Sequence, residues 1–230
     1  MINLNNTPKD LVNDFKITEH VFNRYNININ SDLPIKVFHN AAFIKQALNC
    51  FIDHKNIDLS AIHHFSIGQL TDYLIRSHKY YLNKRLPEIE QEMVFVISEF
   101  GYNRPLLKVI LNFLLTYKKE LMEHFTYEEA HLFPYAVSLD KVKDNPELLN
   151  TLMNYSTKMF LDFHDHTEEI ELSELKKELL KYRPAINKSF PYNIMLEKLH
   201  TLEIDLYIHS VIEEEVLVPK LIDIERRLSL

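Results

Sequence analysis

Two stretches of the sequence decide the fold: His-Phe-Thr-Tyr-Glu-Glu-Ala-His-Leu-Phe-Pro at 124–134 and His-Ser-Val-Ile-Glu-Glu-Glu-Val-Leu-Val-Pro at 209–219. They agree at five of eleven positions, which are the first His, both Glu, the Leu and the Pro. In each stretch the first His and the first Glu are four residues apart, a spacing that places both on one face of an α-helix. We interpret the two stretches as an internal repeat that carries a His/Glu pair on two helices.

Each of these pairs interrupts an apolar stripe whose members recur at alternating spacings of three and four. Such a stripe is typical of a helix that faces a helical bundle. The sequence predicts four long helices, over 66–101, from 105 past 134, from 146 to before 184, and from about 189 towards the carboxyl end. Short connections favour antiparallel neighbours, so we expect an all-α fold with an up-down-up-down four-helix bundle.

Single residues mark where these helices begin and bend. Ser66 with Gln69 three residues later is a capping box, and Pro105 suits the first position of a helix. Pro87 is expected to bend the first helix. Gly101 is a natural residue just beyond its end.

A histidine interrupts each of the four stripes: His78, His124, His166 and His209. The midpoint of the first two is residue 101 and that of the middle two is residue 145, both in predicted turns. The midpoint of the last two lies between 187 and 188, again in a predicted loop. Residues equally far from a turn lie at one height in an up-down bundle, so we expect the four imidazoles to converge.

Four imidazoles and the carboxylates of Glu128 and Glu213 at one level of a core predict a dinuclear metal site. An isolated buried carboxylate would be costly, whereas mixed imidazole and carboxylate ligands suit iron, and also manganese or zinc. Two histidines for each ion with both glutamates bridging would distribute the ligands evenly. The alternative is a set of ordinary hydrogen-bonded core histidines.

Other histidines and glutamates close to these positions have to be assigned as ligands or as non-ligands. His166 continues the apolar stripe of its helix, whereas His164 lies on the polar side, so His166 is the expected ligand. His131 falls on the stripe of the second helix and is expected to be a buried histidine or a hydrogen-bond partner of a ligand. Glu129 and Glu214 could accept hydrogen bonds from ligand imidazoles, but surface positions are slightly favoured. His200 is expected to be solvated.

Composition bounds the remaining possibilities. The net charge of −7 argues against a sequence-independent nucleic-acid binder, which needs a basic face. The single cysteine, Cys50, excludes an internal disulfide and a cysteine-based metal site within one chain. No signal pattern and no apolar run of membrane-spanning length is found. We therefore expect a soluble cytoplasmic protein with no membrane or nucleic-acid partner.

The sequence resembles the hemerythrin-like (HHE cation-binding) proteins and, more specifically, the repair-of-iron-centres family of di-iron proteins. The resemblance covers about residues 66–225 and rests on His78 with Leu-Pro-Glu-Ile at 86–89, the two repeats, and His166 in Asp-His-Thr-Glu-Glu-Ile-Glu at 165–171. It implies a hemerythrin-like bundle over 61–230 with a non-haem, oxo- or hydroxo-bridged di-iron centre. The implied ligands are the histidines at 78, 124, 166 and 209, with Glu128 and Glu213 as bridges.

Residues 1–60 are expected to form a small helical amino-terminal domain. Val-Phe-Asn-Arg-Tyr-Asn-Ile-Asn-Ile at 21–29 resembles the segment that leads into a Cys-Cys-Gly-Gly motif in that family. Here Asn-Ser-Asp-Leu at 30–33 takes the place of the motif, so the domain is degenerate and cannot supply thiol chemistry from that position.

The resemblance implies a function in repairing iron–sulfur clusters damaged by nitrosative or oxidative stress, with iron donation as the mechanism. Damaged iron–sulfur proteins would then be the partners. A second hypothesis is hemerythrin-like binding or sensing of dioxygen or nitric oxide, a small diatomic ligand. A third is a metal that only cross-links the helices. The oligomeric state, including a homodimer, stays open.

Overall fold

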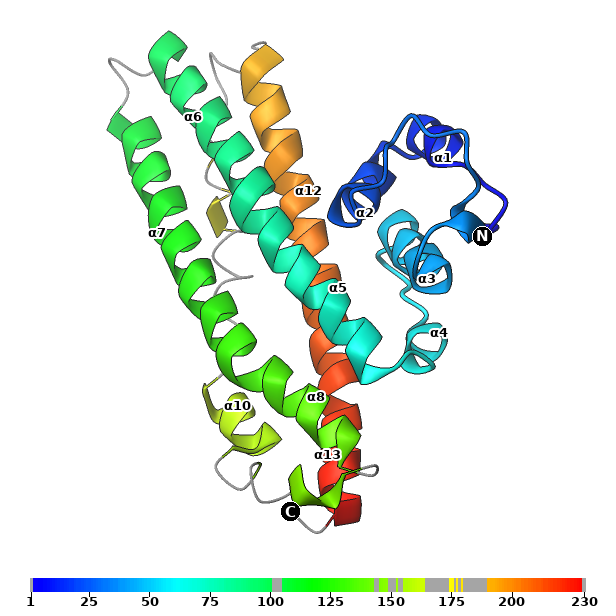
Figure 1. Ribbon diagram of the computed structural model, residues 1–230. Helices are drawn as coiled ribbons and strands as arrows, with labels where there is room; N and C mark the ends of the chain where they lie inside the picture. Colours follow the sequence, from blue (N-terminus) through cyan, green and yellow to red (C-terminus); the bar gives the residue numbers. More distant parts are fainter. Residues whose placement is uncertain are drawn as a thin grey trace.

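The computed structural model describes residues 2–100, 105–142, 145–148, 152, 155–163, 174–175, 177, 179 and 190–228. All regular secondary structure in these ranges is helical, as the sequence predicts. Three long helical runs lie side by side, and the amino-terminal helices pack against one side of them (Figure 1). No helix among the described residues is long and apolar enough to span a membrane.

The first long run consists of α5 (Ile67–Tyr80), a π-helical turn (Tyr81–Arg85) and α6 (Leu86–Phe100). Its start is the predicted one. The Ser66 side chain accepts a hydrogen bond from the backbone N–H of Gln69, and the Gln69 side chain accepts one from the backbone N–H of Ser66. This reciprocal pair satisfies two of the backbone donors that a helix leaves open at its start.

The other two long runs share this construction. The second consists of α7 (Pro105–Tyr127), a π-helical turn (Glu128–Leu132) and α8 (Phe133–Lys141). The third consists of α12 (Phe190–Ile212), a π-helical turn (Glu213–Leu217) and α13 (Val218–Leu228). α6 contacts both α7 and α12, and α8 contacts both α5 and α13.

Each π turn ends two residues before a proline: Pro87, Pro134 or Pro219. A proline inside a helix lacks the N–H and meets the carbonyl four residues earlier. In all three runs that carbonyl lies within the π turn, whose wider hydrogen-bond spacing accommodates the ring. The bend expected at Pro87 therefore takes the form of a π turn, and it recurs in the two other runs.

The π turn also corrects one prediction. A π turn holds one residue more than a regular helical turn, so the core position after Glu128 passes from 131 to 132. Leu132 is fully buried, whereas His131 is exposed and its Nδ1 lies 3.0 Å from the backbone oxygen of Tyr127. The expectation of a buried His131 was wrong because it assumed an uninterrupted α-helix.

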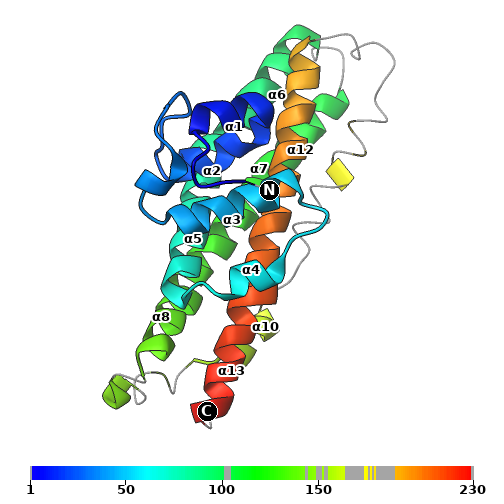
Figure 2. The same cartoon turned by 90° about the vertical axis from the view of Figure 1, so that its right-hand side faces the viewer.

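The amino-terminal segment is built from short helices: α1 (Pro8–Asp14), a 3-10 turn (Lys16–Thr18), α2 (Glu19–Arg24), a second 3-10 turn (Ile35–Val37), α3 (Ala41–Ile52) and α4 (Leu59–His63). α2 contacts α5, α3 contacts α12, and α4 contacts the π turn at 213–217. Figure 2 shows α3 and α4 beside these long helices.

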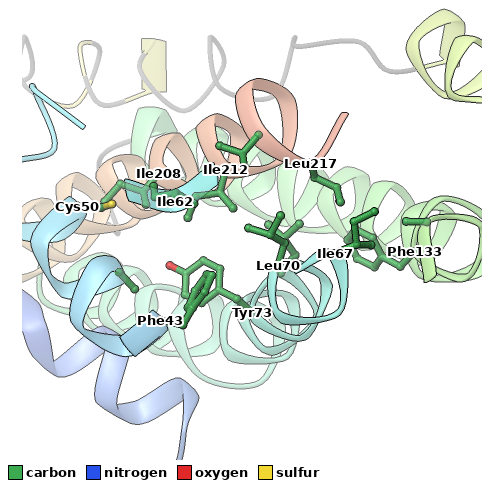
Figure 3. Close-up of a cluster of buried hydrophobic side chains, with 14 of the residues drawn as sticks. Phe43, Cys50, Ile62, Ile67, Leu70, Tyr73, Phe133, Ile208, Ile212 and Leu217 are labelled. Atoms are coloured by element: carbon green, nitrogen blue, oxygen red, sulfur yellow. The ribbon is translucent and has the colours of Figure 1, made fainter. Parts of the chain in front are cut away.

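Side chains of this segment belong to the same hydrophobic core as the long helices. Phe43 of α3 packs with Tyr73 of α5, their rings 5.2 Å apart, and Ile62 of α4 lies in the same cluster as Ile208 and Ile212 (Figure 3). A second cluster fills the opposite end of the long runs, between α6, α7 and α12. The segment 1–60 is therefore held by buried apolar surface rather than by polar contacts alone.

The third predicted helix is only partly described. Its described parts include a 3-10 turn (Pro146–Leu148) and α10 (Thr157–Phe163), which contacts α13. His164 and His166 lie outside the described residues, as does Gly101.

Candidate metal centre

Three of the predicted ligands converge in the core. His78 Nε2 lies 3.1 Å from Glu128 Oε2 and 3.3 Å from His209 Nε2. One ligand atom from each of the three lies within 4.8 Å of the others, and all three residues are buried. They come from α5, the second long run and α12, so a site formed by residues 131 apart in sequence results from the packing of three helices.

The two other described candidates lie on the same cluster. His124 Nε2 is 2.5 Å from Glu128 Oε1, and His209 Nε2 is 3.4 Å from Glu213 Oε2. Both contacts join residues four apart on one helix, which is the spacing that led to the prediction. Five of the six predicted ligands are therefore brought together, and the sixth, His166, lies outside the described residues.

The site lies where one hydrophobic cluster gives way to the other. On the first run, Leu74 belongs to the cluster shared with the amino-terminal segment and Tyr81 to the opposite one, with His78 between them. On the second run, Leu132 and Phe125 flank Glu128 in the same way. The polar groups are thus enclosed by apolar packing above and below.

This enclosure perturbs the titration of the site. The pKa of Glu213 is raised well above its ordinary value, chiefly by burial and then by the neighbouring Glu128 carboxylate. The pKa of His209 is lowered well below its ordinary value, chiefly by burial and then by His78. The metal-free site therefore favours a neutral imidazole at 209 and a protonated carboxyl at 213.

Groups around the candidate ligands hold them in place. Glu129 Oε1 lies 3.0 Å from His78 Nδ1, a distance at which the imidazole N–H donates to the carboxylate. The Glu129 side chain is also 37% exposed. Both alternatives predicted for it therefore hold: it lies at the surface and also accepts a hydrogen bond from a candidate ligand. Phe125 stacks on the His78 ring at 3.9 Å between centroids and 10° between planes.

Sequence reasoning missed one group next to the site. Arg24 of α2 and Asp205 of α12 form an ion pair with both side chains almost fully buried. The Tyr81 hydroxyl donates to Asp205 Oδ1 at 2.6 Å, and the Tyr81 ring lies 5.9 Å from that of His209. The available signal was an acidic residue four positions before His209, on the core-facing side of the helix.

The remaining histidines divide between core and surface. His20 is buried, and its Nδ1 lies 2.6 Å from the Tyr80 hydroxyl, while burial lowers its pKa to about 2. His200 is exposed, as predicted, with Nδ1 3.3 Å from Glu203.

The donor set fits metal ions. Two ligand atoms each ~2.1 Å from one ion can be at most ~4.2 Å apart, and the four contacts given above, which link the five side chains, are all shorter than this limit. His209 Nδ1 and Glu213 Oε1 are buried without a hydrogen-bond partner among the described residues. A cation near two buried carboxylates would neutralise their charge, which no lysine or arginine in these contacts does.

Comparisons with family models, curated proteins and solved structures found no match.

Proposed function

We propose that the chain is a non-haem di-iron protein with a hemerythrin-like four-helix bundle, and that it repairs iron–sulfur clusters damaged by nitrosative or oxidative stress by supplying iron. The convergence of His78, Glu128 and His209 in the core carries this proposal. His124 and Glu213 extend the same cluster on either side. The proposed fourth helix is the one that contains His166.

The composition of the site favours two ions over one. A single ion could be reached by the nitrogen atoms of His78 and His209, which are 3.3 Å apart. His124 instead lies against the other oxygen of Glu128, at 2.5 Å from Oε1. A carboxylate that faces imidazoles with both of its oxygens is suited to bridge two ions, as in other dinuclear sites.

Each surrounding residue has a defined part in holding the iron that the protein would deliver. When bound, the ions supply the ferrous iron that a damaged cluster lacks. Glu129 holds the proton of His78 on Nδ1, which leaves Nε2 free as a ligand. Glu213 has to release its proton for binding, and can take it up again when the ions leave. Phe125 covers the His78 ring and excludes water from that side.

The test begins with metal analysis of anaerobically purified protein, for which we expect two irons per chain. The second step is reactivation of an iron–sulfur enzyme whose cluster has been damaged by nitric oxide. The wild-type protein should restore activity, and the double variant His124→Ala/His209→Ala should not. A matched control is His200→Ala, since His200 is exposed and lies nine residues, or about 13.5 Å of helix, before His209. One iron or none, or equal recovery with the double variant, contradicts the proposal.

A second candidate function, binding or sensing of dioxygen or nitric oxide, is favoured by one observation. A surface pocket of about 430 Å³ is lined by Lys79, Phe125 and Glu129, among others. The last two of these residues contact His78 directly, so a small ligand needs to pass only one layer of side chains. Reversible, oxygen-dependent optical bands in the reduced, iron-loaded protein would support this function over iron supply.

A further inference from the structure

Two complementary atoms on α12 lack partners. His209 Nδ1 and Asp205 Oδ2 are both buried, and neither has a hydrogen-bond partner among the described residues, so the two atoms do not bond to each other in this structure. The two residues are four apart on one helix, so their side chains lie on the same face, one turn from each other. One atom is a nitrogen that can carry a proton, and the other is a carboxylate oxygen that can only accept one when ionised.

The orientation of the His209 ring is fixed by the cluster. Its Nε2 faces inward, 3.3 Å from His78 Nε2 and 3.4 Å from Glu213 Oε2. Nδ1 is therefore the nitrogen that carries the proton when Nε2 binds an ion. His78 is arranged in the same manner, and there the structure supplies an acceptor for Nδ1–H, the carboxylate of Glu129. His209 needs an equivalent acceptor.

Asp205 is held firmly enough to serve. Its Oδ1 accepts from the Tyr81 hydroxyl at 2.6 Å and from Arg24 Nη2. Arg24 is itself enclosed by four aromatic rings whose centroids lie 5.0 to 5.4 Å from its guanidinium carbon: Phe51, Tyr73, Tyr80 and Tyr81. With Oδ1 occupied in this way, Oδ2 is the oxygen left for another donor.

We propose that Asp205 is a positioning residue of the metal centre: when an ion on Nε2 leaves the proton of His209 on Nδ1, Oδ2 accepts a hydrogen bond from it, and Arg24 holds the carboxylate from the amino-terminal segment. This inference rests on the proposed metal site. It makes α2 part of the support of the centre, although Asn-Ser-Asp-Leu stands at 30–33 in place of a Cys-Cys-Gly-Gly motif. A buried ion pair contributes little stability by itself, whereas a carboxylate that orients a ligand imidazole strengthens metal binding.

The test uses the full chain loaded with Zn²⁺, a diamagnetic ion, and compares wild type with Asp205→Asn. The amide at 205 can keep the contacts of Oδ1 but presents an N–H₂ group in place of Oδ2. We expect the affinity for Zn²⁺, measured by competition with a chelator, to fall by about 10- to 100-fold. In spectra of histidine labelled with ¹⁵N, the Nδ1 proton of His209 should be protected from exchange with water in wild type and lose that protection in the variant.

D205N weakens the partner of the buried Arg24 and can destabilise the fold. A second variant therefore tests the proposal without leaving a buried charge unpaired. Arg24→Met/Asp205→Leu removes both charges, which buried ion pairs tolerate far better than the loss of one. It should fold, and it should show the same loss of Zn²⁺ affinity and of Nδ1 proton protection. The matched control is Asp223→Asn, which breaks an exposed ion pair with Arg227 on α13 and should change neither quantity.

The outcomes separate the two proposals. A wild-type chain that binds no metal refutes the proposed function. A wild-type chain that binds two ions, together with folded D205N and double variants whose affinity stays within twofold and whose His209 Nδ1 proton is unchanged, overturns the role of Asp205 alone.

Discussion

We expect the Glu213 carboxylate to destabilise the metal-free protein and to stabilise the metal-bound protein. The substitution Glu213→Gln tests both effects. In the metal-free protein the Glu213 carboxyl is buried beside Glu128, and its Oε1 has no hydrogen-bond partner among the described residues. An ionised carboxylate there is penalised by lost hydration and by the neighbouring negative charge, which is why its pKa is raised. An amide of the same shape carries no charge and avoids both costs.

The sign of the pH dependence follows from this shift. Because the pKa of Glu213 is raised, the native state keeps a proton that the unfolded chain releases above the ordinary glutamate value. The contribution of this group to stability is therefore full at low pH and is lost as the pH rises towards the folded-state pKa. The proton belongs to the pair Glu128 and Glu213 rather than to one oxygen, so removing either carboxylate should remove the effect.

We expect E213Q to stabilise the metal-free protein by about 1 to 3 kcal/mol at about pH 8, the order of magnitude of the penalty on a buried charged form that the amide cannot adopt. At about pH 5 the gain should shrink, because wild type then carries the proton. In the metal-bound protein the same change should destabilise, since it removes a ligand. The loss of affinity should exceed the ~10- to 100-fold that follows loss of an outer hydrogen-bond partner.

Urea unfolding at both pH values measures the free energy of unfolding of wild type and E213Q, each with metal and after chelator treatment. Competition with a chelator measures the change in affinity. His209 is present in both proteins, but it contacts Glu213, so the difference between them reports the replacement of Glu213 together with its coupling to His209. E213Q that destabilises the metal-free protein at the higher pH, or that leaves the pH dependence of its stability unchanged, would refute this reasoning about the buried carboxylate pair.

Three further perturbations test the fold and the site. Addition of metal to 100 times its dissociation constant should raise the free energy of unfolding by about 2.7 kcal/mol, and a chelator should reverse the rise; an unchanged unfolding midpoint would mean that no ion binds. Leu70→Ala, at a fully buried position of the core in Figure 3, should lower the free energy of unfolding in urea by about 2 to 5 kcal/mol. Its control, Val94→Ala, lies at a 52% exposed position on α6 and should change this free energy by no more than about 0.5 kcal/mol. Ser66→Ala should cost about 1 kcal/mol through loss of the helix cap, and a smaller loss in Gln69→Ala would show that the hydroxyl contributes more than the reciprocal amide.

Much of the fold could be predicted because the signals are local. A capping box at Ser66 and a proline at the first helical position, Pro105, mark the starts of α5 and α7. The apolar stripes identify the helices and the faces that they bury. The convergence of His78, Glu128 and His209 followed from combining this periodicity with equal distances from the turns.

What escaped prediction depends on contacts between segments distant in sequence, or on small departures from ideal helices. Arg24 and Asp205 are 181 residues apart, and nothing in either neighbourhood indicates the other. The π turns add one residue without altering the apolar pattern before them, so the stripe was followed to His131 instead of Leu132. Glu129 was difficult to place because a carboxylate at the rim of a core can reach both water and a ligand imidazole.

The three wide turns have a consequence for how the length of this chain can change. Each holds one residue beyond a regular helix, so deletion of a residue such as Ala130 would restore ordinary winding. Leu132 would then stand three residues after Glu128, where a regular helix also faces the core, so α8 would keep its buried face. The cost would fall on Pro134, whose ring would again meet a carbonyl of a regular helix. Deletion of a residue outside these turns would instead rotate the rest of the helix by about 100°. The wide turns are therefore the places in the long helices where the loss of one codon should do least harm to the pattern of buried side chains.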